Sequence, residues 1–272
     1  MSRHLIAYIL TAARRDRLMM TLALMIVAGA SLAIFMGSAA VSEQRSFSIA
    51  FAAGALRFIG VIGITLFCCF YIRRAFDAKE VEFLLSRPIS RSNFLFSHAA
   101  AFSFLAVVVS AVVILTVLAV GRPDVGGLML WGFSVMVEFS VMAIVALFFS
   151  MVISSASGAA LAALGFYALS RMMGVLLGIV DMPPDSVIFA ALGSMMKLIS
   201  VIIPRLDLMG QSSWLIYGPL GSGGVQFMPT AGTYAFTVME HLGLVGFIAV
   251  QGIVFTGLLL AAAAYDFSRK QF

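Results

Sequence analysis

Charged residues are scarce in this chain of 272 residues, making up 11% of it, against roughly 25% in an average soluble domain. Hydrophobic residues make up 62%. A soluble fold of this size has too little interior to cover so much apolar surface, whereas lipid acts as a solvent for apolar faces. The lack of charge therefore excludes an ordinary soluble domain and predicts an all-α, polytopic membrane protein that forms a single transmembrane domain over residues 1–272.

Cysteine and nucleotide-binding motifs are lacking as well. The two cysteines, Cys68 and Cys69, are adjacent in an apolar run, and helix neighbours point about 100° apart, so they do not form a disulfide. The chain has no G-x-x-x-x-G-K-[ST] sequence to hold ATP phosphates, and its glycine-rich stretch 221–224 is only a turn. His98 and His241 have no partner at metal-ligand spacing, so we predict no metal site. We expect no catalytic residues and no cofactor bound by this chain.

Six apolar runs are each long enough to cross a hydrocarbon core of about 30 Å at 1.5 Å per residue. They lie at 17–38, 51–72, 95–120, 128–153, 158–180 and 242–264. Ahead of them, residues 3–16 alternate apolar and polar side chains at helical spacing. This pattern favours an amphipathic helix (domain residues 1–16) at the membrane surface, with a plain cytoplasmic stub as the alternative.

The distribution of basic residues predicts the orientation. The net charge of +5 would suggest nucleic acid in a soluble protein, but here charge that orients helices explains it better, so no nucleic-acid partner is expected. With both termini in the cytoplasm, the cytoplasmic pieces carry 11 of the 17 lysines and arginines. A seventh span would move Arg269 and Lys270 outside, so we predict six.

The outer region 181–241 contains one more apolar stretch, 187–203, which Lys197 interrupts and Pro204 ends. At about 17 residues it is marginal as a span and is expected to be a short re-entrant or interfacial helix.

The cytoplasmic loop 73–94 joins the second and third spans. Residues 76–86 suit a short amphipathic helix that Pro88 ends, and Ser90 is placed to cap the next helix. From composition alone, an ordinary positively charged loop would explain this segment. Its sequence from Glu80 to Phe94, however, resembles the coupling-helix signature of type-2 ABC transporter permeases, in the string Leu84-Leu85-Ser86-Arg87-Pro88-Ile89-Ser90-Arg91. A second patch, Ile203 to Leu208 followed by Trp214 to Gly218, resembles one branch of that family.

The resemblance implies the permease subunit of an ABC exporter in a bacterial inner membrane. Such permeases have six spans, pair with a second copy or a homologue, and bind two cytoplasmic ATPase subunits, which hold ATP and Mg. The residues that we predict to contact the ATPase are Glu80, Glu82, Phe83, Leu84, Arg87, Pro88 and Arg91. Acidic and arginine side chains would form pairs across that interface, with an apolar anchor from Phe83 or Leu84.

Four polar residues lie within the predicted spans, at about 9 to 15 Å from their outer ends. They are Arg57, Glu138, Arg171 and Gln251. Charges at such depth cost roughly 2.5–3.5 kcal/mol each, so each needs a partner or a role. Glu138 paired with an arginine to fix helix packing is one interpretation, and a layer that lines a translocation path or its outer gate is the other.

Two further functions remain open beside the ATP-driven exporter. An ATP-independent carrier or channel would need a continuous polar path across the membrane. A non-transporting scaffold would relay ATPase motion to an outer partner through the 181–241 region.

Overall fold

The structure is a computed structural model that describes residues 3–41, 43–79, 90–180, 187–218 and 234–269, and the regular elements in these ranges are all helices. They are α1 (Arg3–Arg15), α2 (Arg17–Ala39), α3 (Gln44–Asp77), α5 (Arg91–Gly121), α6 (Val125–Val152), α7 (Ala156–Val180), α8 (Val187–Ile202), the 3₁₀ turn η1 (Leu206–Leu208), α9 (Ser213–Tyr217) and α10 (Tyr234–Arg269). Six of them, α2, α3, α5, α6, α7 and α10, are long and apolar enough to cross a membrane. The predicted all-α class and number of candidate spans are confirmed, and we treat the chain as an integral membrane protein.

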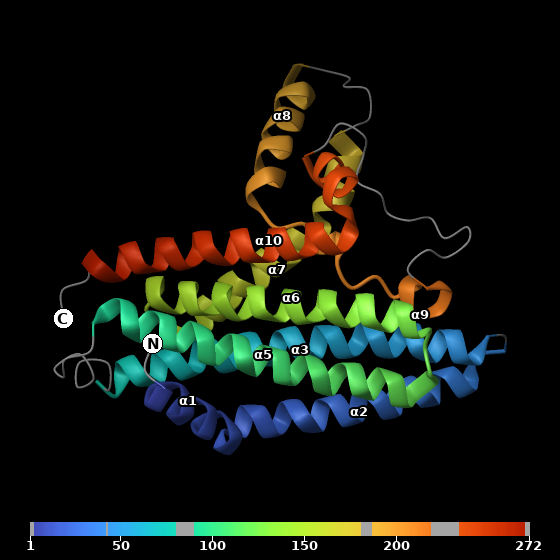
Figure 1. The fold of residues 1–272 in the computed structure, drawn as a ribbon, viewed down its shortest axis with the longest axis horizontal. Coiled ribbons are helices and arrows are strands. Elements are labelled where there is room, and N and C mark those ends of the chain that lie inside the picture. The colour runs from blue at the N-terminus through green and yellow to red at the C-terminus, as the bar shows by residue number, and fades with distance from the viewer. Residues whose placement is uncertain (1–2, 42, 80–89, 181–186, 219–233, 270–272) are drawn as a thin grey trace.

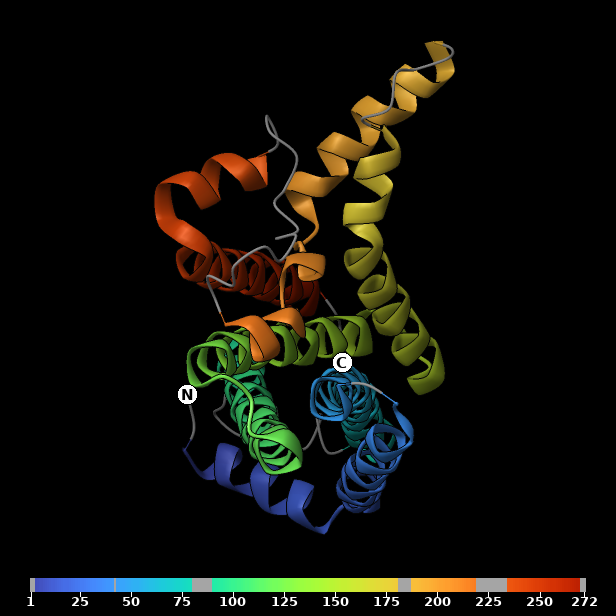
Figure 2. The same cartoon turned by 90° about the vertical axis from the view of Figure 1, so that its right-hand side faces the viewer.

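Helix α6 is the centre of the bundle. In the most apolar 18-residue stretch of α6, 67% of the residues are buried, against 22% in the corresponding stretches of α2 and α10. Figures 1 and 2 show α2, α3, α5, α6 and the second half of α10 running side by side, with α6 between the α3–α5 pair and α10. A helix surrounded in this way can hold a polar side chain away from lipid, which becomes important for Glu138.

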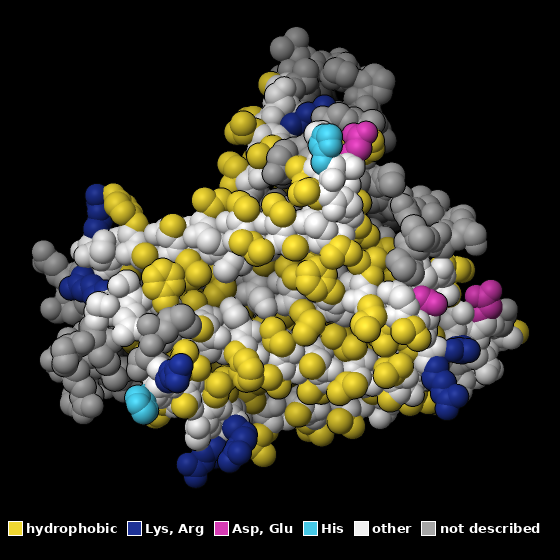
Figure 3. All heavy atoms as spheres, in the orientation of Figure 1, with side chains coloured by type: hydrophobic (Ala, Val, Ile, Leu, Met, Phe, Trp, Pro, Cys, Tyr) yellow, Lys and Arg dark blue, Asp and Glu magenta, His cyan; other side chains and the backbone are white. Residues whose placement is uncertain are grey.

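On the face of the bundle seen in Figure 3, hydrophobic side chains run along its length and charged side chains gather toward its two ends. Large side chains such as Leu24, Leu115 and Ile253 are exposed, as expected of residues that face lipid. Both termini lie toward the same end of the bundle (Figure 1). We call this the predicted cytoplasmic end and the opposite one the predicted outer end.

Helix α1 runs across the bundle at the predicted cytoplasmic end rather than along it (Figure 2). Its apolar face is buried, with Leu5 at 7%, Ile9 at 0% and Ala13 at 1% exposure. This face packs mainly on α5, so α1 is held by protein as well as by any membrane surface.

Polar side chains set the starts of three long helices. Asp16 accepts a hydrogen bond from the Leu18 N–H at 2.8 Å and so caps α2. Ser90 accepts one from the Asn93 N–H at 3.2 Å, which confirms its predicted role as the cap of α5. Asp124 caps α6 through the Gly127 N–H at 2.7 Å.

Two helices leave the bundle near its outer half. Helix α8 has 16 residues, which at 1.5 Å per residue is about 24 Å and short of a full crossing. Helix α10 bends at Gly243, whose φ of 68° is left-handed and open to glycine. Figures 1 and 2 show α8 and the first part of α10 standing away from the parallel helices of the bundle, together with the end of α7, on which α8 packs.

Candidate functional site

The predicted ATPase-contact residues Glu80, Glu82, Phe83, Leu84, Arg87 and Pro88 lie outside the described residues. What is described is how the loop leaves and rejoins the bundle. Helix α3 continues to Asp77, so Phe76 and Asp77 belong to this helix rather than beginning a separate one as predicted. An ion pair between Arg73 and Asp77 at 3.1 Å, one turn apart, supports this extension.

Arg91, the seventh predicted contact residue, ties the start of α5 to the end of α10. Its Nη1 donates hydrogen bonds to the carbonyl oxygens of Phe267 at 3.2 Å and Ser268 at 3.0 Å. The last carbonyls of a helix have no partner within it, and a cation there also complements the helix dipole. The rings of Phe94 and Phe267 stack beside this contact, with centroids 5.7 Å apart. The return of the 73–94 loop is therefore locked to the last membrane helix.

Three of the four predicted intramembrane polar residues form one buried cluster. Glu138 of α6 is 0% exposed, and its Oε2 lies 3.8 Å from Nε of Arg57 on α3. Its other oxygen accepts a hydrogen bond from the Tyr167 hydroxyl on α7 at 2.9 Å. One carboxylate thus joins three spans, with an ion pair on one side and a hydrogen bond on the other.

Both arginines of the cluster also bind the backbone of the 203–217 segment, which follows α8. Nη1 of Arg57 donates to the carbonyls of Met209, at 3.3 Å, and Gly210. Nη1 of Arg171 donates to the carbonyls of Leu206 and Met209, the latter at 2.9 Å. Met209 therefore presents a single carbonyl oxygen to two arginines from different helices.

This arrangement explains why arginines are needed at this depth. Outside an α-helix, carbonyl groups have no regular partner, and in an apolar environment each unsatisfied group costs several kcal/mol. A guanidinium offers five N–H donors in a fixed fork, so it can serve carbonyls and a carboxylate together. The cluster contains two arginines and one glutamate, and backbone carbonyl dipoles stabilise the excess positive charge.

Further contacts hold the 203–217 segment. The Gly210 N–H donates to Oγ of Ser134 on α6 at 2.9 Å. Arg205 and Asp207 form a two-bond pair at 2.9 and 2.8 Å and are largely buried. Gly210 has a φ of +62°, and a Cβ there would collide with the Arg57 guanidinium, so only glycine fits.

At the predicted outer end, α9 docks on the first turn of α6. The Asp124 N–H donates to the Leu215 carbonyl at 2.9 Å. A Cβ at position 127 would overlap the carbonyl oxygen of Trp214, so Gly127 permits this approach. The 203–217 segment is thus fastened to α6 at two points, at Gly210 through Ser134 and at Leu215 through the helix start.

Gln251, the fourth predicted member of the layer, belongs to a different site. It lines a pocket between α8 and α10 together with Ile203, Pro204 and Phe255. Its Oε1 is buried and makes no hydrogen bond within the described part of the chain. Gln251 is separated from the other three residues because a similar depth in the membrane does not mean a similar direction around the helix. Gln251 faces the α8 side of α10.

Two members of the cluster, Ser134 and Tyr167, were not predicted from the sequence. Each lies four residues before a predicted member, Ser134 before Glu138 and Tyr167 before Arg171, and so shares its helix face. This spacing of four residues could have indicated from the sequence that Ser134 and Tyr167 belong to the cluster. The contribution of the Met209 and Gly210 carbonyls had no such signal, because backbone groups are the same at every position.

Within the described ranges, no group of three His, Cys, Asp or Glu side chains is placed to hold a metal ion. The buried cluster instead joins α3, α6, α7 and the 203–217 segment through one ion pair and several hydrogen bonds. Nε of Arg57 and Oε2 of Glu138 face each other in that ion pair and make no hydrogen bond to a described residue. Comparison with models of known protein families finds no match for this chain, and comparison with curated protein sequences finds none either.

Proposed function

We propose that this chain is the permease subunit of an ATP-driven ABC exporter that works with a separate ATPase. The observation that carries the proposal is the loop 80–94, with its Ser-Arg-Pro-Ile-Ser-Arg sequence, between two long membrane helices at the predicted cytoplasmic end. ATP and Mg would bind the partner, because this chain has no Walker-type loop to hold them. In this proposal the chain itself catalyses no reaction, and it resides in a bacterial inner membrane with cytoplasmic termini.

The fold supports the proposal with a mechanical connection. Arg57 lies 20 residues before the end of α3 at Asp77, which corresponds to about 30 Å of unbroken helix. A displacement of the loop would therefore reach the Arg57–Glu138 pair without passing through a flexible joint. Since Arg57 also binds the carbonyls of Met209 and Gly210, the 203–217 segment would move with α3.

A second candidate function is a scaffold that relays ATPase motion outward without transport. The charged groups of the cluster are buried against one another and against backbone carbonyls rather than directed into an open polar path. The cavity between α5, α6 and α10 is lined mostly by apolar side chains, with Ser140 and Thr256 contributing hydroxyls. These observations favour a relay over an ATP-independent carrier, which needs a polar path.

The decisive experiment is affinity purification of the tagged, detergent-solubilised chain from its native membranes, followed by an ATPase assay. We expect an ATPase to co-purify with the wild type and to be lost from the Glu80→Ala, Glu82→Ala, Arg87→Ala triple variant. A matched control replaces Arg45 and Arg122, which lie at the opposite end of the bundle, with alanine and should retain the partner. If no ATPase co-purifies with the wild type, the exporter proposal is wrong.

The scaffold is distinguished by reconstituting the complex in sealed vesicles and separating ATP hydrolysis from solute movement. An exporter couples hydrolysis to the loss of a lipid or solute from one side of the membrane. A relay hydrolyses ATP while the contents of both leaflets and the lumen stay unchanged.

A further inference from the structure

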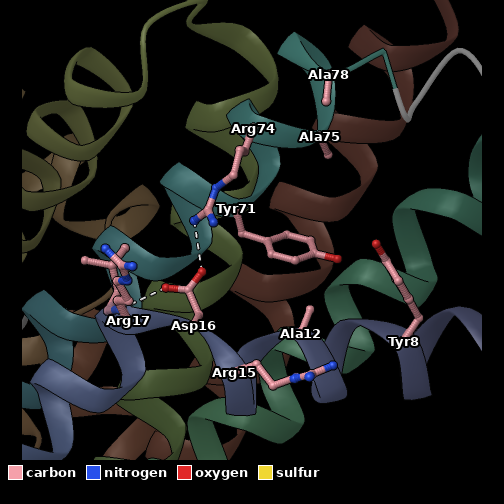
Figure 4. Close-up of a pocket in the computed structure, with 10 residues that line it drawn as sticks. Tyr8, Ala12, Arg15, Asp16, Arg17, Tyr71, Arg74, Ala75 and Ala78 are labelled. Carbon is pink, nitrogen blue, oxygen red and sulfur yellow. Dashed lines mark hydrogen bonds and ion pairs between the residues drawn. The ribbon is translucent and has the colours of Figure 1, made fainter.

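A basic pocket opens where α1, the start of α2 and the end of α3 meet, at the predicted cytoplasmic end (Figure 4). Its volume of about 590 Å³ lies within the range of roughly 300–1,000 Å³ typical of small-molecule sites. The polar side chains that line it are Tyr8, Arg15, Asp16, Arg17, Tyr71 and Arg74. It lies far along α3 from the buried cluster and shares no residue with it.

The pocket carries an excess of positive charge, since three arginines and one aspartate line it. Both oxygens of Asp16 are used, one by the α2 cap and the other by Arg74 at 2.9 Å. Arg15 and Arg17 make no hydrogen bond or ion pair with any described residue, and both are exposed. Figure 4 shows Arg15 reaching from the end of α1 toward Tyr8. Figure 4 shows Arg17 on the other side of Asp16 from Tyr71, at the start of α2. Two guanidinium groups free of described protein partners at the rim of one pocket, with Arg15 pointing toward a tyrosine, suit a phosphate group.

The surroundings indicate that this phosphate belongs to a lipid. Arg17 is the first residue of α2, and Met20, Leu24 and Val27 continue its face at spacings of three and four residues. These three side chains are 65%, 69% and 62% exposed, so they form an apolar stripe that leads from the pocket along the span. A headgroup bound at Arg17 would place its acyl chains on this stripe, whereas a free phosphate would make no use of it.

We propose that this pocket is a binding site for the phosphate of an anionic membrane lipid. Basic pockets beside membrane helices on the cytoplasmic side are where such headgroups bind, because that leaflet carries negative charge. The lipid would bridge Arg15 of α1 and Arg17 of α2 over the end of α3, close to where the 80–94 loop begins. It would thereby fix α1 against the bundle, and this role does not depend on whether the chain transports anything.

The test is native mass spectrometry of the full chain in detergent, titrated separately with phosphatidylglycerol, phosphatidylcholine and glycerol phosphate. We expect phosphatidylglycerol to bind more tightly than phosphatidylcholine, and glycerol phosphate not to compete at equal concentration. An arginine near a membrane surface contributes about fivefold to such binding, so Arg15→Gln with Arg17→Gln should weaken it by about 25-fold.

Two further variants keep the test independent of folding. Arg14→Gln removes the same charge from the same turn of α1 without altering the pocket lining, and should bind as the wild type does. Ala12→Phe keeps every charge but fills the pocket, and should also lose the lipid. The proposal is overturned if Arg14→Gln weakens phosphatidylglycerol binding as much as the Arg15→Gln, Arg17→Gln double variant does, or if Ala12→Phe still binds the lipid fully. It is also overturned if phosphatidylglycerol and phosphatidylcholine bind equally well, or if glycerol phosphate binds as tightly as the lipid.

Discussion

Replacing Glu138 with glutamine tests whether the buried cluster holds the fold together. Glutamine has nearly the same shape and keeps an oxygen to accept the Tyr167 hydroxyl. What it removes is the negative charge 3.8 Å from Arg57, in the middle of the bundle where Glu138 is fully buried. Arg57 then keeps only the backbone carbonyls of Met209 and Gly210 as partners.

The expected loss is about 3 kcal/mol. A charge pair at this distance interacts by about 4 kcal/mol at an effective dielectric constant of 20, and removing one partner of a buried pair typically costs about 3–5 kcal/mol. The lower end applies, because Arg57 keeps its hydrogen bonds to the Met209 and Gly210 carbonyls. At roughly 2–4 °C per kcal/mol, Tm should fall by roughly 6–12 °C. Glu138→Ala should lose about 1 kcal/mol more, since it leaves the Tyr167 hydroxyl unpaired.

The assay is thermal unfolding of the purified chain in one detergent, for Glu138→Gln, Arg57→Gln and the double variant. Because the two residues interact directly, their effects should be non-additive by at least about 1 kcal/mol. Ser140→Ala is the control, since the Ser140 hydroxyl donates only to the Met136 carbonyl of its own helix and should matter by under about 0.5 kcal/mol. An unchanged Tm in Glu138→Gln together with additive effects would refute a structural ion pair, and altered partner ATPase activity at normal stability would then favour a gate.

Two other contacts give sharp expectations. Gly127→Ala should push α9 away from α6, because the new Cβ would collide with the Trp214 carbonyl oxygen, and the free energy of unfolding should fall by about 1–3 kcal/mol. The fluorescence of Trp214 should also shift to longer wavelength. Emission spectra recorded in a background with Trp131 replaced by phenylalanine isolate the Trp214 signal. Arg91→Ala should release the last turn of α10, so hydrogen–deuterium exchange of the amides near 262–269 should become about tenfold faster. Arg91→Lys keeps the charge and should show a smaller increase. Exchange at the wild-type rate in Arg91→Ala would contradict the contact between Arg91 and α10.

The spans and the cap at Ser90 were accessible from the sequence because their causes are local. Hydropathy over about 20 residues identifies a membrane helix whatever its neighbours are, and a serine just ahead of an apolar run is a helix cap for reasons of backbone geometry alone. Ser90 illustrates the second case. The need of Glu138 for a cationic partner was equally visible, because a lone carboxylate inside lipid is too costly.

The path of the 203–217 segment was not accessible in this way. Its hydropathy predicts an outer loop with a weak motif, yet Arg205 and Asp207 are largely buried and the Met209 carbonyl binds two arginines. The depth of a residue in a span does not say which way its side chain faces around the helix axis. Gln251 was therefore predicted to lie with Arg57, Glu138 and Arg171, but it lines the pocket between α8 and α10 instead. Packing between residues 35 to 153 positions apart in the sequence decides both points, and a local sequence pattern does not reveal such packing.

The shared Met209 carbonyl constrains how the outer half of the bundle can move. Arg57 reaches it from α3 and Arg171 reaches it from α7, so shifting either helix alone strands a buried donor or acceptor, at about 1–3 kcal/mol for each group. The lower-cost displacement carries α3, α7 and the 203–217 segment together and places the bending at its flanks. The positive φ at Gly218, +77°, and the bend of α10 at Gly243 mark where the backbone can absorb that motion. Any push delivered at the predicted cytoplasmic end of α3 would therefore move the backbone beside α9, at the predicted outer end, rather than being absorbed inside the bundle.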